Sequence, residues 1–100
     1  MAKNNEIIVV ATPHSGNPNG SWKAKLSRMA NCKYVVQEEH GQVKEVFKLV
    51  GGVHRTRKDK RRIDFDNLIS ASPYIQRKYQ HMDVSRKKGE SNPVRYRAAL

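Results

Sequence analysis

The feature that most constrains this chain is a dense run of positive charge near its middle. Six of the eight residues from Arg55 to Arg62 are arginine or lysine, and only Thr56 and Asp59 interrupt them. Cations packed this closely repel one another unless a polyanion or bulk water faces them. Neither a strand nor a helix would gather all six on one face beside a core. The run therefore predicts an exposed loop or arm that a partner surrounds.

The positive charge is also uneven along the chain. The net charge is +11, and thirteen of the twenty basic residues lie in residues 51–100. Only 37% of the residues are hydrophobic, which is below the usual share for a globular domain. We therefore expect a small core in one part of the chain and a solvated, basic remainder that a partner helps to order.

Cysteine content and hydropathy indicate the cellular compartment in which the protein is expected. Cys32 is the only cysteine, so an intrachain disulfide is impossible and a reducing compartment is expected. The longest apolar run, Ile7 to Ala11, is too short to span a membrane, and the first residues lack the apolar stretch of a signal peptide. We expect an intracellular (cytoplasmic) protein, or one inside an assembled particle, with no membrane partner.

The first half of the chain predicts a short antiparallel sheet. Residues 6–11 are rich in β-branched side chains and predict a strand buried on both faces. Residues 12–20 consist almost entirely of turn-forming residues. Polar and apolar residues alternate from 22 to 28, which favours a strand, although Trp22, Leu26 and Met29 would also share a helical face.

Residues 33–50 predict a hairpin whose turn is His40-Gly41. The content of Val and Phe favours two strands. The alternative is a helix from Glu38 to Val50, which Gly51-Gly52 would end.

Beyond the basic run the pattern becomes helical. Asp64 can cap a helix that carries Phe65, Leu68 and Ile69, and Ser72-Pro73 can begin another. The predicted fold class is therefore α+β, with a short antiparallel sheet (residues 6–50) followed by one or two helices (64–82) and a basic tail. Residues 1–83 would form one domain with a basic arm at 53–62, and residues 84–100 an extended basic tail.

Nucleic acid is the commonest polyanion that such an arm can bind. Arginine outnumbers lysine in the run, which favours forked contacts to phosphate oxygens. Tyr96, between two arginines, could stack on a base or pack, whereas Tyr74 and Tyr79 are expected in the core. The predicted nucleic-acid-binding residues are Arg55, Arg57, Lys58, Lys60, Arg61, Arg62, Arg86, Lys87, Lys88, Arg95 and Arg97.

Two settings and one different class of function follow from this charge. The protein could be a structural subunit of a nucleoprotein particle, such as a virion or ribosome, with neighbouring subunits as further partners. It could also be a free regulator, of phage origin for example. The alternative is a protein–protein effector that docks onto an acidic host protein, because an acidic groove would select the same arginines.

One stretch carries a family resemblance. The segment Arg61-Arg62-Ile63-Asp64-Phe65-Asp66-Asn67-Leu68 resembles the core of the RusA-type Holliday-junction resolvases, in which basic residues precede Asp-x-Asp-Asn-Leu. The resemblance implies a dimeric nuclease in which Asp64 and Asp66 bind magnesium and branched DNA is cut. The lysine that the family carries three positions after the Asn is replaced here by Ser70.

The same two aspartates have a purely structural interpretation. Asp64 would cap a helix, and Asp66 would lie in its positively polarised first turn. The four histidines are not spaced as metal ligands. We therefore predict a protein that is not an enzyme and has no metal site and no cofactor, with a magnesium-dependent nuclease as the further alternative.

Overall fold

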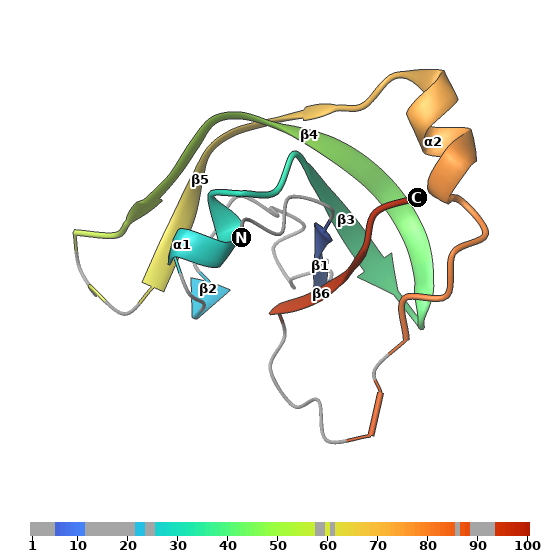
Figure 1. Ribbon diagram of the computed structural model, residues 1–100, viewed down its shortest axis with the longest axis horizontal. Helices are drawn as coiled ribbons and strands as arrows, with labels where there is room; N and C mark the ends of the chain where they lie inside the picture. The colour runs from blue at the N-terminus through green and yellow to red at the C-terminus, as the bar shows by residue number, and fades with distance from the viewer. Residues whose placement is uncertain are drawn as a thin grey trace.

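A computed structural model describes residues 6–11, 22–23, 26–57, 60, 62–85, 87–88 and 94–100. These residues form one strongly bent, mixed sheet of six strands in the order β2-β5-β4-β3-β1-β6 (Figure 1). The strands are β1 (Glu6–Ala11), β2 (Trp22–Lys23), β3 (Tyr34–Glu39), β4 (Gln42–Arg55), β5 (Arg62–Ser70) and β6 (Val94–Ala98). The helices are short: α1 (Leu26–Met29) and α2 (Pro73–Tyr79).

The predicted fold class, a short antiparallel sheet followed by helices, is wrong, because the protein is mostly β. The helix expected from Asp64 is the strand β5, which pairs with β4. Residues 94–98, expected in a basic tail, form β6 beside β1. The sheet is mixed because β1 runs parallel to β3. The predicted turns at 12–20 lie outside the described residues.

Strand β1 is an interior strand of the sheet, and its side chains enter a hydrophobic core on each face. It pairs with β3 on one side and β6 on the other, so that Ile8 lies between Val35 and Tyr96. Residues 7–10 are each at most 1% exposed. The predicted strand buried on both faces is confirmed, and its β-branched residues suit that position.

The hairpin of β3 and β4 turns at His40-Gly41, as predicted. Both residues have positive φ, 55° and 80°, as a two-residue type I′ turn requires. The Gly41 amide donates to the Glu38 carboxylate at 3.2 Å. The alternative helix from Glu38 to Val50 is wrong.

A bulge bends β4 and β5 together. Val50 pairs with Asn67 and Val53 pairs with Phe65, so β4 holds one more residue than β5 between these pairs. Gly51 supplies the positive φ of 88° that the bulge needs, and a Cβ there would lie 3.0 Å from the Asp66 Cβ. The bend carries the two strands in an arch over the rest of the sheet (Figure 1).

The inner face of the sheet packs around α1. Its buried residues are Ile8, Val10, Met29, Cys32, Val35, Ile63, Phe65 and Val94. Each of the two alternatives predicted for residues 22–29 holds for a part of them, since Trp22–Lys23 form the strand β2 and Leu26–Met29 form the helix α1. Among the described residues, no helix is long and apolar enough to cross a membrane.

The outer face packs against α2 at one end only. Its buried residues are Ile7, Val9, Val36, Val46, Ala71, Tyr79 and Val84. Helix α2 begins as predicted, because the Ser72 hydroxyl accepts from the Ile75 amide and Pro73 occupies the first turn. Gln76 bonds both the amide (3.0 Å) and the carbonyl (2.7 Å) of Val46, which continues the ladder where β5 ends.

Candidate nucleic-acid interface

The central basic run forms the tip of the β4–β5 hairpin. Arg55 ends β4 and Arg62 begins β5. The Thr56 amide donates to the Arg62 carbonyl, and the Arg55 Nη1 donates to the Lys60 carbonyl, both at 2.9 Å. We call Arg55, Arg57, Lys60 and Arg62 the basic tip. Lys58 and Arg61 lie outside the described residues.

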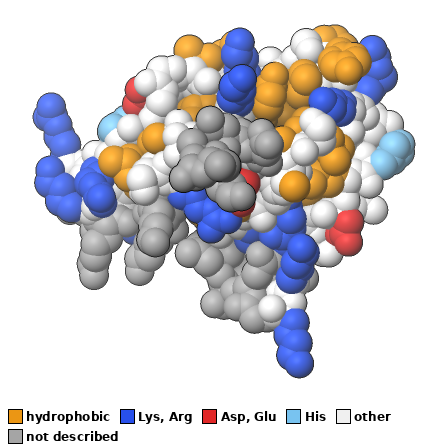
Figure 2. Space-filling view, viewed as in Figure 1, with side chains coloured by type: hydrophobic (Ala, Val, Ile, Leu, Met, Phe, Trp, Pro, Cys, Tyr) orange, Lys and Arg blue, Asp and Glu red, His pale blue; other side chains and the backbone are white. Residues whose placement is uncertain are grey.

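The basic tip projects from one end of the arch. Arg55, Arg57 and Lys60 are exposed, and Arg62 is half-buried. Blue side chains gather at this end of the molecule (Figure 2). Within the described part of the chain, no carboxylate forms an ion pair with Arg55, Arg57 or Lys60. Their charge is therefore directed at solvent, or at a partner.

The resolvase-like stretch lies in β5 beside the tip. Asp64 is half-buried opposite His54, and Asp66 contacts the His54 Nδ1 at 2.5 Å. Leu68 packs on the inner core. The interpretation of Asp64 as a helix cap is wrong, because the segment is a strand. No group of three or more His, Cys, Asp and Glu side chains in the described ranges could hold a metal ion.

The other predicted binding residues divide into exposed and buried ones. Lys87 and Lys88 are exposed, whereas Arg86 lies outside the described residues. Arg95 and Arg97 are only 2% and 8% exposed. They alternate along β6 with Val94 and Tyr96, so their side chains leave the sheet on the outer face while the apolar ones enter the inner core.

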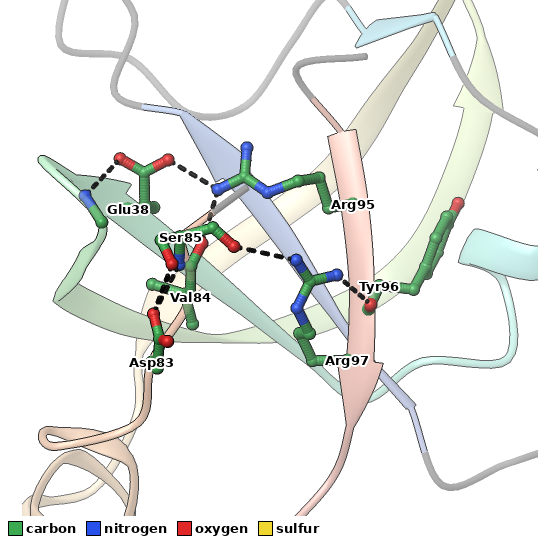
Figure 3. A network of polar contacts seen from close by, with 8 residues as sticks. Glu38, Asp83, Val84, Ser85, Arg95, Tyr96 and Arg97 are labelled. Carbon is green, nitrogen blue, oxygen red and sulfur yellow. Dashed lines mark hydrogen bonds and ion pairs between the residues drawn. The ribbon is translucent and has the colours of Figure 1, made fainter. Parts of the chain in front are cut away.

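The two buried arginines tie β6 to the segment that follows α2 (Figure 3). The Arg95 Nη2 donates to the Glu38 carboxylate at 2.6 Å and to the Val84 carbonyl at 2.7 Å. The Arg97 Nη2 donates to the Ser85 carbonyl at 3.0 Å. We call these contacts the arginine network. It holds residues 84–85 across the end of the sheet.

Tyr96 packs within the protein. The Arg28 guanidinium lies 3.9 Å from the centre of its ring, and Arg28 also donates to the Glu6 carboxylate at 3.0 and 2.7 Å. Burial raises the pKa of Tyr96 to about 12 and the pKa of the nearby Cys32 thiol to about 11. Neither group is charged near neutral pH, which suits a structural position.

The two tyrosines of α2 differ in a way that sequence reasoning missed. Tyr79 is 2% exposed and its ring lies 6.4 Å from that of Tyr34, whereas Tyr74 is 66% exposed. Arg77 and Lys78 are also exposed, at the third and fourth positions after Tyr74, so the three lie on one helix face. The sequence did contain a sign of this difference. Ile75 and Tyr79 are four residues apart and so share the buried face of the helix, which directs Tyr74 away from the core.

A separate hollow lies near the β3–β4 turn. It is lined by residues that include His40, His81 and Asp83. The Ser85 hydroxyl and amide donate to Asp83 and lower the pKa of its carboxyl group. This arrangement is polar and open, and it presents no set of metal ligands among the described residues.

No family model, curated protein or solved structure matches this chain. The functional interpretation therefore rests on the geometry of its own residues. Three members of the basic tip, Arg55, Arg57 and Lys60, are exposed cations that form no ion pair with a carboxylate among the described residues.

Proposed function

We propose that this protein binds nucleic acid through phosphate contacts of the basic tip and catalyses no reaction. One observation carries the proposal: Arg55, Arg57 and Lys60 are exposed on a hydrogen-bonded hairpin, and no described carboxylate pairs with them. Guanidinium groups match phosphate oxygens in a forked geometry. A hairpin that already holds them together loses little entropy on binding.

The remaining predicted residues contribute unequally to this proposal. Lys87 and Lys88 are exposed in the segment between α2 and β6, away from the basic tip, and would add phosphate contacts of their own (Figure 1). Arg95 and Arg97 are bonded inside the fold, so we assign them to stability. Binding through phosphates would be independent of base sequence and would weaken steeply with salt. These properties suit a subunit of a nucleoprotein particle, or a regulator that binds without sequence preference.

The test is a gel-shift titration against duplex DNA, single-stranded DNA and RNA at several salt concentrations. The tip variant is R57Q/K60Q, because neither side chain makes an ion pair or a hydrogen bond to another described residue. The control is K33Q/K44Q, which removes the same number of positive charges from exposed lysines elsewhere. Lys44 lies 3.7 Å from the Glu39 carboxylate, but both side chains are about half exposed, so losing that pair should cost little stability. If both tip residues contact phosphates, the tip variant should bind unrelated duplexes more weakly and lower the log–log salt slope by about 2.

Three outcomes would refute the proposal. The parent protein could fail to bind DNA and RNA in dilute buffer. The tip and control variants could weaken binding equally, which would indicate net charge alone. A pull-down in which a protein partner survives nuclease digestion, with no binding to purified nucleic acid, would favour the acidic-protein alternative.

A further inference from the structure

Part of the outer face of the sheet carries exposed apolar side chains between the basic tip and α2. Lys48 pairs with Ile69 and Val50 pairs with Asn67, so these four residues share one face. It is the face of Val46, which α2 covers farther along β4. Val50 is 39% exposed and Ile69 is 47% exposed. We call Lys48, Val50, Asn67 and Ile69 the outer strip.

The outer strip leads to the exposed face of α2. β5 ends at Ser70, and α2 begins at Pro73. Tyr74, with 66% of its surface exposed, follows directly and has Arg77 and Lys78 as neighbours on the same face. Figure 2 shows hydrophobic and basic side chains together over this end of the molecule. An exposed aromatic ring beside two cations is the arrangement that stacks on a base while its phosphates are neutralised.

We propose that this surface binds a single strand, with bases on Tyr74 and the outer strip and phosphates at Arg77, Lys78 and the basic tip. The proposal rests on the nucleic-acid binding proposed above and specifies the kind of nucleic acid. A duplex presents phosphates outward and hides the faces of its bases, so it would gain nothing from Tyr74, Val50 or Ile69. A single strand exposes those faces.

The dimensions and charges of the surface fit this ligand. The nine residues of β5 span about 30 Å, which separates the two groups of cations by several nucleotides. Lys48 lies between them. Among the described residues of β5, the carboxylates beside this surface are Asp64 and Asp66. His54 contacts Asp66, so that carboxylate already has a polar partner within the fold.

The test compares Tyr74→Ala with Tyr74→Phe, which keeps the stacking ring. Binding of the full chain is measured by fluorescence anisotropy on labelled single-stranded DNA, single-stranded RNA and duplex DNA of equal length. Tyr74→Ala should weaken single-strand binding about 5- to 100-fold and leave duplex binding unchanged, whereas Tyr74→Phe should bind like the parent. The two single-stranded probes show whether DNA or RNA is preferred.

A second variant separates stacking from charge. R77Q/K78Q should lower the single-strand salt slope by about 1.4, which Tyr74→Ala should leave unchanged. Duplex binding that persists while Tyr74→Ala has no effect on single strands would overturn this inference alone. The same holds if Tyr74→Ala weakens both ligands equally. Absence of binding to all three probes would overturn the proposed function as well.

Discussion

Glu38 and Arg95 form the ion pair whose disruption should be most costly. The Arg95 side chain is 1% exposed and the Glu38 side chain 13% exposed. The Arg95 Nε and Nη1 atoms have no hydrogen-bond partner within the described part of the chain, so the Glu38 carboxylate is its main compensation. Glu38→Gln removes the negative charge and leaves a buried guanidinium beside Arg97, which is also buried.

The expected cost of Glu38→Gln is about 3–5 kcal/mol, because it leaves a desolvated charge without a counterion. Arg95→Met should cost less, about 1–3 kcal/mol, since the Glu38 carboxylate keeps the Gly41 amide and some contact with water. When Arg95→Met is already present, adding Glu38→Gln should change the free energy of unfolding very little, because no buried guanidinium remains to lose its counterion. A domain of this size has only about 5–15 kcal/mol of stability, so Glu38→Gln should come close to unfolding it.

The assay is urea denaturation followed by circular dichroism at pH 7, with m-values compared across variants. The control is Glu39→Gln, whose carboxylate is 46% exposed and lies 3.7 Å from the Lys44 ammonium. That change should stay within about 0.5 kcal/mol. A cost for Glu38→Gln below that of Arg95→Met, or indistinguishable from Glu39→Gln, would show that Arg95 is solvated and that the reasoning is wrong.

Two further predictions concern Glu6 and Cys32. Hydrogen bonds from Arg28 hold the pKa of Glu6 below its ordinary 4.5, so its stabilising contribution is present above that pH and lost as pH falls through the lower folded value. Thermal melts from pH 7 to 3 should show this loss in the parent and less of it in Glu6→Gln; identical profiles would contradict it. Burial raises the pKa of Cys32 to about 11, so the thiol should resist alkylation at pH 8 until denaturant is added. Rapid, complete alkylation of the native protein would show that the thiol is accessible.

The elements that sequence reasoning predicted are those with a strong local cause. The β-branched run of 6–11 suits a buried strand in any fold. His40-Gly41 can adopt the positive φ values that a tight hairpin needs, and both residues do so. Ser72-Pro73 begins α2 because a hydroxyl cap and a fixed φ favour a helix start without tertiary help.

The predictions failed where distant residues decide the structure. Phe65 and Leu68 both face the inner core although they are three apart, a spacing typical of a helix. Between their partners Val53 and Leu49, β4 contains the bulge at Gly51, which changes the alternation expected of β5. A single sequence gives no direct sign of that pairing.

In the candidate site, too, features with a local cause were predictable from the sequence and features that depend on distant residues were not. Charge density alone predicts that the Arg55–Arg62 run is exposed, because burying so many cations would be prohibitive. It gives no warning that Arg95 is buried, because the compensating carboxylate belongs to Glu38, far away in the sequence. Conversely, the sequence predicts Tyr74 in the core, but α2 packs on Val46 through Ile75 and Tyr79 and leaves Tyr74 exposed.

The position of β1 has a consequence for how the chain folds. Its neighbours β3 and β6 come from well-separated parts of the sequence, and β6 is the last strand along the chain. Long loops must therefore close before the most apolar segment gains its second neighbour, which slows folding to the rates typical of non-local β topologies. Until then, Ile7 to Val10 would offer one open edge to other chains, so aggregation should compete with refolding as protein concentration rises.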